Sequence, residues 1–164
     1  MAKNKFITKP RQVDYANIRW APVVNCVVKY KGRFLVVQRS RNLGPFPLYW
    51  NGVSGFLDDR KSLNEKVVEE LREEAGMPKR KITRIRLGEI FDLEDPKCRK
   101  TWIVHPVLVE VDDEAVKLNW EAKSYKWVTL REARKLKLLP GFNRVLEKLS
   151  AWIDNERGSR CPKK

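Results

Sequence analysis

The sequence predicts an α/β fold, on three observations along its 164 residues. Two apolar runs at 22–29 and 34–39 flank a glycine-containing turn, which is typical of a β-hairpin. The Ser/Thr-x-x-Glu pattern that begins helices occurs at Ser62 and again at Thr129. The length corresponds to one domain, and a hydrophobic content of 42% is sufficient for a globular core.

The two ends of the chain are basic. The first acid is Asp14, and four cations precede it: Lys3, Lys5, Lys9 and Arg11. We therefore expect a basic N-terminal arm over residues 1–18, a folded domain over 19–155 and a basic C-terminal tail over 156–164.

The first predicted elements are a hairpin and the loop after it. Residues 22–29 (PVVNCVVK) and 34–39 (FLVVQR) have the β-branched, apolar composition of buried strands. Tyr30 to Arg33 supplies the turn. Residues 42–49 (NLGPFPLY) are marked as a loop by proline and glycine, and we expect this loop to line a substrate cleft.

A helix with an acidic face is predicted within residues 55–77 (GFLDDRKSLNEKVVEELREEAGM). It begins at Ser62 with a capping box and ends at Gly76, because glycine is favoured just past a helix end. A narrow apolar stripe is formed by Leu63, Val67 and Leu71. Beside it, carboxylates spaced i, i+3, i+4 share one face: Glu70, Glu73 and Glu74. Hard oxygen ligands of this kind suit Mg²⁺ or Mn²⁺.

The second half continues the alternation of strands and helices. The pattern predicts a strand region over 81–93, a loop over 92–100, a strand over 101–111, a turn over 112–114 and a short extended region from Leu118. The capping box at Thr129 opens a short helix. A final helix covers 142–155, and its apolar face contains Val145, Leu149 and Trp152.

The chain is strongly basic, with 35 Lys and Arg against 21 Asp and Glu and a formal net charge of +14. This charge favours polyanionic partners, either phosphate-bearing small molecules or nucleic acid. Much of the internal excess lies at Lys79, Arg80, Lys81, Arg84, Arg86, Lys97, Arg99 and Lys100. A basic surface without any specific partner is the alternative.

Other residue types limit the possible compartment and the possible chemistry of the protein. Three scattered cysteines (Cys26, Cys98 and Cys161) show neither metal-ligand spacing nor a disulfide framework, which predicts a reducing, cytoplasmic compartment. The single histidine, His105, cannot form a metal cluster, and we expect it in the core or on an edge strand. No segment has the length and apolarity of a membrane helix or a signal region, so we expect no membrane association.

Residues 55–77 resemble the Nudix box, the signature of hydrolases that cleave nucleoside diphosphates linked to another group. Gly55 fits the opening glycine of that pattern, and Glu70 to Met77 (ELREEAGM) fits its closing half. The resemblance extends over about residues 20–155, and it includes a Trp-Val pair at Trp127.

Within the box and immediately before it, the sequence departs from the family pattern at four positions. Lys61 stands where the family has Glu, and Glu69 stands where it has Arg, so the change is reciprocal. We hypothesise that the two residues form a reversed ion pair that supports the helix. Lys66 replaces a small residue on the acidic face, where it either neutralises the carboxylates or weakens metal binding. Ser54 replaces the first glycine of a pair.

The resemblance implies an α/β/α sandwich around a mixed sheet and a Nudix-type pyrophosphohydrolase that uses Mg²⁺ or Mn²⁺. The implied metal ligands are Glu70 and Glu74, with Glu73 assisting and with the backbone carbonyl of Ser54. Bound metal would neutralise the pyrophosphate and lower the pKa of a water molecule. Glu121 is the first candidate for the general base and Glu73 the second.

Recognition of the substrate depends on residues outside the box. The candidates for phosphate binding or base stacking are Arg39, Arg41, Phe46, Tyr49 and Trp102. The expected substrate is a nucleoside diphosphate derivative such as ADP-ribose. Two other functions stay open, namely a catalytically weak or inactive Nudix-fold protein that binds nucleotide or RNA, and an RNA 5′-end pyrophosphohydrolase. The base, the leaving group and the oligomeric state are left undetermined.

Overall fold

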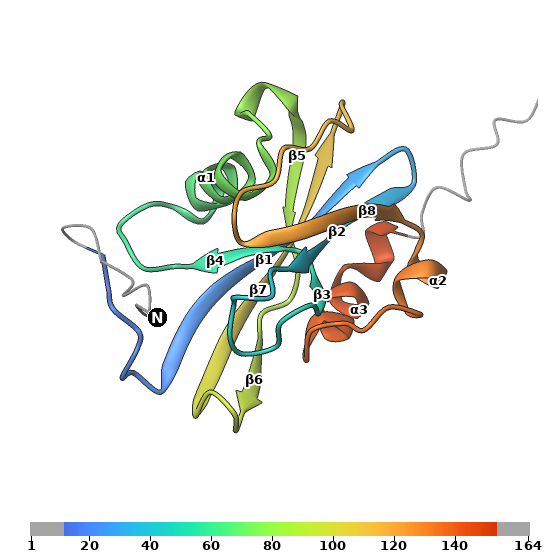
Figure 1. Ribbon diagram of the computed structural model, residues 1–164. Helices are drawn as coiled ribbons and strands as arrows, with labels where there is room; N and C mark the ends of the chain where they lie inside the picture. The colour runs from blue at the N-terminus through green and yellow to red at the C-terminus, as the bar shows by residue number, and fades with distance from the viewer. Residues whose placement is uncertain (1–11, 154–164) are drawn as a thin grey trace, which may run out of the picture.

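A computed structural model describes residues 12–153, which form a mixed β-sheet between two helical layers (Figure 1). Its elements are β1 (Trp20–Tyr30), β2 (Arg33–Arg39), β3 (Trp50–Asn51), β4 (Val53–Phe56), α1 (Leu63–Ala75), the 3₁₀-helix η1 (Lys79–Lys81), β5 (Ile82–Leu87), β6 (Phe91–Asp95), β7 (Lys100–Val111), β8 (Ala122–Val128), α2 (Leu130–Ala133) and α3 (Phe142–Ile153). The predicted tail over 156–164, most of the predicted arm over 1–18, and Cys161 lie outside the described residues.

Two long strands form the centre of the sheet. β1 runs parallel to β7 from Trp20 beside Thr101 to Lys29 beside Glu110, and the other pairings are antiparallel. β1 also pairs with β2 and β4, β7 pairs with β5 and β6, and β2 pairs with β3 and β8. The predicted α/β/α sandwich with a mixed sheet is confirmed.

The two faces of the sheet carry separate cores. Successive side chains of a strand point to opposite faces, so Val27 packs towards α3 whereas Cys26 and Val28 pack towards α1. Figure 1 shows α1 on one side of the sheet, with α2 and α3 on the other. This arrangement places the acidic helix directly over the strands β1 and β4.

Helix α1 begins and ends where its local sequence predicts. The Ser62 hydroxyl accepts a hydrogen bond from the Glu65 backbone N–H, and the Glu65 carboxylate accepts one from the Ser62 N–H, so the capping box is complete. Gly76 closes the helix in the left-handed conformation at φ 65°. Val67 and Leu71 of the predicted stripe are fully buried.

The predictions between the helices were less accurate. The single strand region over 81–93 is two strands, β5 and β6, and the loop predicted over 92–100 is confined to residues 96–99. The physical reason is a hairpin in which buried Phe91 pairs with Val104 of β7. The extended region that begins at Leu118 does not join the sheet before β8: its Asn119 N–H donates to the Glu74 carbonyl at the end of α1 (3.3 Å).

Several single residues can now be placed. His105 lies partly buried on β7, where its Nδ1 is 3.1 Å from the Val23 carbonyl oxygen. Residue Tyr15 of the predicted arm stacks on Phe56, so this part of the arm packs against the domain. Within residues 12–153, no helix is both long and apolar enough to cross a membrane.

Candidate active site

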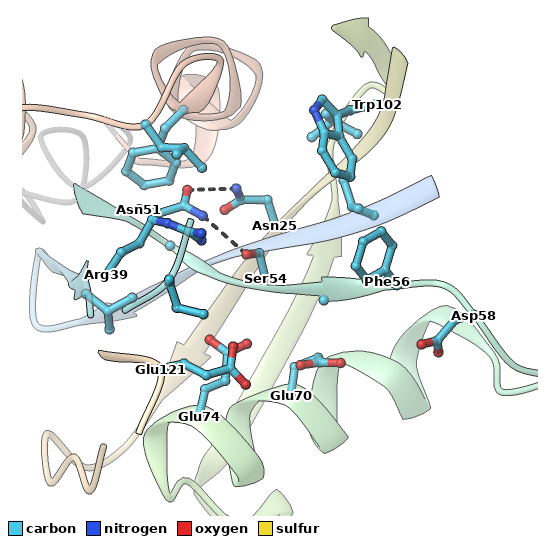
Figure 2. Close-up of a pocket in the computed structure, with 18 of the residues that line it drawn as sticks. Asn25, Arg39, Asn51, Ser54, Phe56, Asp58, Glu70, Glu74, Trp102 and Glu121 are labelled. Atoms are coloured by element: carbon cyan, nitrogen blue, oxygen red, sulfur yellow. Dashed lines mark hydrogen bonds between the residues drawn. The ribbon is translucent and has the colours of Figure 1, made fainter. Parts of the chain in front are cut away.

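A cavity of about 1130 Å³ is lined by the acidic face of α1 and by the first residues of β7 (Figure 2). This volume is enough for a nucleotide-sized ligand. One wall is acidic and comes from α1, where Glu69, Glu70, Glu73 and Glu74 line the cavity. The aromatic wall consists of Phe46, Phe56, Trp102 and Phe142, of which Trp102 and Phe142 pack on the α3 side of the sheet.

The centre of the acidic wall is built by Glu70 and Glu74, one helical turn apart. Figure 2 shows both carboxylates directed from α1 towards β4. Gly55 of β4 allows this close approach, because a Cβ atom there would lie 2.1 Å from the Glu70 carboxylate. Glu121, from the segment that precedes β8, brings its carboxylate beside Glu74 (Figure 2). The helix face predicted from sequence therefore gains a third acid from a distant part of the chain.

The environment of these two carboxylates disfavours their ionised form. Burial raises the pKa of Glu70 to about 7, an effect that Lys66 opposes and that the charges of Glu73 and Glu69 reinforce. Burial also raises the pKa of Glu74 well above its usual range, and Glu121 and Glu70 add to the rise. Carboxylates forced together in this way favour a cation among them.

The chemistry of this set of donors fits a divalent metal ion. Glu70 and Glu74 supply paired hard oxygen ligands, and they would hold Mg²⁺ or Mn²⁺ at the cavity wall. No three Asp, Glu, His or Cys side chains among residues 12–153 come together as a complete metal site. Mg²⁺ usually keeps waters and binds through a few carboxylates together with substrate phosphates, so two carboxylates suit a metal that is completed by substrate.

The reciprocal departure at Lys61 and Glu69 forms an ion pair. The Lys61 ammonium donates to the Glu69 carboxylate at 3.0 Å and 3.3 Å, and to Asp59 at 2.8 Å. These contacts raise the pKa of Lys61, with the Asp59 hydrogen bond as the largest cause. Lys66 reaches the same Glu69 carboxylate from the other side at 3.1 Å. The reversed pair predicted from sequence is present.

Reversing both charges of this pair should cost less than reversing either one. Lys61→Glu alone places an acid beside Glu69, and Glu69→Arg alone places a base beside Lys61, whereas the double change restores attraction. We expect the double change to recover part of the stability lost in each single change, measured as a favourable coupling in urea unfolding of the full cycle. Recovery should stay incomplete because Glu69 also bonds to Lys66. Strict additivity of the two single changes would contradict the pairing.

The two candidates for a general base differ in exposure. The side chain of Glu73 is 47% exposed and lies at the rim of the cavity, 3.8 Å from the Arg72 guanidinium. Glu121 is half-buried, and burial raises its pKa, while Arg39 and a hydrogen bond from Asn119 oppose the rise. A raised pKa brings a carboxylate closer to the basicity that proton abstraction at neutral pH requires.

The predicted substrate-binding residues divide into two groups. Arg39, Phe46 and Trp102 line the cavity. The Arg39 guanidinium also holds the loop after β2, since it donates to the carbonyl oxygens of Phe46 (3.2 Å) and Pro45 (3.1 Å). Arg41 and Tyr49 are not among the residues that line the cavity: Arg41 is exposed, and Tyr49 packs edge-on behind Phe46 with ring centroids 5.4 Å apart.

Sequence reasoning missed a chain of two side-chain hydrogen bonds at the back of the cavity. Asn25 Nδ2 donates to Asn51 Oδ1 at 2.9 Å, and Asn51 Nδ2 donates to Ser54 Oγ at 3.2 Å (Figure 2). These hydrogen bonds connect β4 to β1 and fix the position of β4, the strand that faces Glu70 and Glu74. Gly52 is required beside it, because a Cβ there would lie 2.4 Å from the Cys26 carbonyl oxygen.

Two further cavity residues were also missed. Trp120 is 65% exposed at the rim, immediately before Glu121 in sequence, and that adjacency was a usable signal. Asp58 is 3% exposed and bonds to Lys66 across the start of α1. Asp58 precedes the predicted helix start at Ser62, where no local pattern distinguished it from an ordinary loop acid.

Comparison with known proteins places these features in one family. The chain matches the family model described as "NUDIX domain" over residues 19–152. No curated protein matches the chain significantly. Among solved structures, a MutT protein from Methanosarcina mazei Go1 is 25% identical with a TM-score of 0.64, covering 87% of this chain and 98% of that chain.

Two more solved structures share the fold at lower identity. An Ap4A hydrolase from C. elegans is 22% identical with a TM-score of 0.62, covering 84% of this chain and 98% of that chain. The NUDIX domain of Shewanella oneidensis NrtR, solved with ADP ribose, is 18% identical with a TM-score of 0.69, covering 88% of this chain and 95% of that chain.

Proposed function

This chain belongs to the Nudix family of pyrophosphohydrolases, and we propose that it hydrolyses the pyrophosphate bond of a nucleoside diphosphate linked to another moiety, with Mg²⁺ or Mn²⁺. One observation carries the proposal: Glu70 and Glu74 line the same cavity as Phe46 and Trp102. A ligand with anionic phosphates at one end and a flat ring at the other can contact both sets of residues in this cavity.

The residues of this chain divide the work of hydrolysis between binding and proton transfer. When bound at Glu70 and Glu74, the metal would supply charge neutralisation for the pyrophosphate and acidify a water molecule. The Glu121 carboxylate takes the proton of the attacking water, because it is half-buried beside Glu74 and has a raised pKa. Trp102 and Phe46 hold the base or sugar of the substrate by stacking.

An ADP-ribose-like substrate is the specific form of the proposal. The NrtR domain with a similar fold was solved with ADP ribose. In this chain, the aromatic wall accommodates one nucleoside, and the loop held by Arg39 closes the cavity beside it. Hydrolysis would then release AMP and ribose 5-phosphate, with one oxygen from water in one of the two products.

A substrate panel tests this proposal. We expect the full-length protein to convert ADP-ribose in Mg²⁺ or Mn²⁺, and to show no turnover in EDTA. The panel contains ADP-ribose, diadenosine tetraphosphate, nucleoside triphosphates and RNA with triphosphate or capped 5′ ends, and products are identified by mass spectrometry. Reaction in ¹⁸O-labelled water identifies the phosphorus that is attacked. If the correctly folded protein turned over none of the small molecules, the proposal would be overturned.

A 5′-end RNA pyrophosphohydrolase is the second candidate, favoured by the exposed indole of Trp120 at the cavity rim. Exposed aromatic side chains beside basic ones are typical of single-strand binding. Lys97 lies 4.9 Å from the centroid of the Phe46 ring, and the chain has a net charge of +14. Turnover of RNA alone in the same panel would favour this function, and salt-sensitive RNA binding without any turnover would favour a binding protein.

A further inference from the structure

The Lys66 side chain is inserted into the row of carboxylates along α1. Its ammonium lies 3.0 Å from Asp58 Oδ1, 3.1 Å from Glu69 Oε2 and 3.4 Å from Glu70 Oε1. A fourth carboxylate, that of Asp59, lies at 3.8 Å. The Lys66 side chain is only 6% exposed. A buried ammonium with this many acidic partners occupies the kind of position that a bound cation would take.

The acids around Lys66 would repel one another without it. Asp58 and Glu69 have 4% and 15% of their side chains exposed, so water screens their charges poorly. Helical spacing explains how one lysine serves several of them, because Glu69 and Glu70 lie three and four residues after it. Asp58 approaches from the strand–helix connection, so the cluster joins two separate elements.

We propose that the Lys66 ammonium is a resident cation that fills one end of the carboxylate row and confines divalent metal to the Glu74 end. Glu70 is shared, since its Oε1 atom faces Lys66. Asp58 and Glu69 are then ion-paired with the Lys66 ammonium and do not coordinate the metal. The inference rests on the proposed metal-dependent function, and it predicts that this chain takes up fewer divalent ions than its number of acids suggests.

Lys61 provides the matched control for Lys66. It contacts two of the same carboxylates, with Nζ 2.8 Å from Asp59 and 3.0 Å from Glu69. Its side chain, however, is 45% exposed, against 6% for Lys66. Removing Lys61 subtracts the same charge from the outside of the cluster, where water already screens it. If cation affinity rose only because one positive charge was lost, substitution of Lys61 and substitution of Lys66 would have the same effect. If Lys66 occupies an internal cation position, only its own substitution opens that position to Mn²⁺.

The test counts Mn²⁺ bound to full-length protein by electron paramagnetic resonance and calorimetry, without substrate. We expect Lys66→Gln to gain an Mn²⁺ binding step that wild type lacks, or to bind about tenfold more tightly, because a positive charge has left a poorly screened cluster. Lys61→Gln should keep the wild-type count, and Lys66→Arg should keep it as well. An unchanged count and affinity in Lys66→Gln would overturn the inference.

Loss of folding in Lys66→Gln is a separate outcome that remains informative, since removal of one partner leaves buried charges uncompensated. In that case the unfolding transition is followed while Mn²⁺ is added. Recovery of a cooperative transition with Mn²⁺, but not with the same ionic strength of Na⁺, supports the inference, and failure to recover overturns it. Absence of Mn²⁺-dependent turnover by wild type in the substrate panel would refute the proposed function, whereas an unchanged count and affinity between wild type and variant would refute only the role of Lys66.

Discussion

Glu74→Gln is expected to abolish metal-dependent hydrolysis while making the metal-free protein more stable. Turnover should fall by at least about 100-fold, because the amide removes one of two carboxylates that would hold the metal. Stability should rise, because burial and the neighbouring Glu121 and Glu70 raise the pKa of Glu74 and so make its ionised form costly at neutral pH. Activity and urea unfolding in EDTA, measured on the same preparation, test both effects.

The opposite signs of these effects make the result diagnostic. A substitution that damages the fold lowers activity and stability together, whereas removal of a functional buried charge separates them. Glu89→Gln is the matched control, because Glu89 has an exposed carboxylate paired with Lys148 and is outside the cavity lining. This control should leave turnover unchanged. Retention of full activity in Glu74→Gln would remove Glu74 from the metal site.

Metal-free protein should lose stability as the pH rises from about 5 to 8. Glu70 has a pKa raised from 4.5 to about 7 in the folded state, mainly by burial. The folded state therefore binds its proton more tightly than the unfolded chain, and the stabilisation is lost as the pH passes from the unfolded to the folded pKa. This carboxyl alone would account for a loss on the order of 3 kcal/mol at most.

Urea unfolding in EDTA at pH 5 and pH 8, followed by tryptophan fluorescence, measures this loss. Carboxyls whose pKa is lowered, such as Glu65 and Glu132, titrate below this window and do not mask it. Mg²⁺ should restore stability at pH 8 more than at pH 5, because only the ionised carboxylates bind it. Glu70→Gln should flatten the pH dependence, and a profile unchanged by that substitution would assign the loss to other groups.

The sequence was most informative where structure depends on neighbours within a turn or two. The capping box at Ser62, the stop at Gly76 and the acidic face of the helix all follow from spacings of a few residues, and each is confirmed. The pairing of Lys61 with Glu69 was also predictable, because two opposite departures from one pattern indicate a contact. The hairpin that contains Phe91 was missed because β6 is held by its pairing with β7, which lies on the other side of the turn at 96–99.

The sequence by itself therefore determined the helix, its ends, the fold class and which acids share one face. Only the tertiary structure decided which partners those acids meet. It brought Glu121 beside Glu74, buried Lys66 against Asp58, and placed Trp102 in the cavity wall while leaving Arg41 outside. Local hydrogen bonds and helical spacing are set by short stretches of chain. The burial and pKa of a charge depend instead on how distant strands and loops pack around it, and that packing is a property of the whole fold.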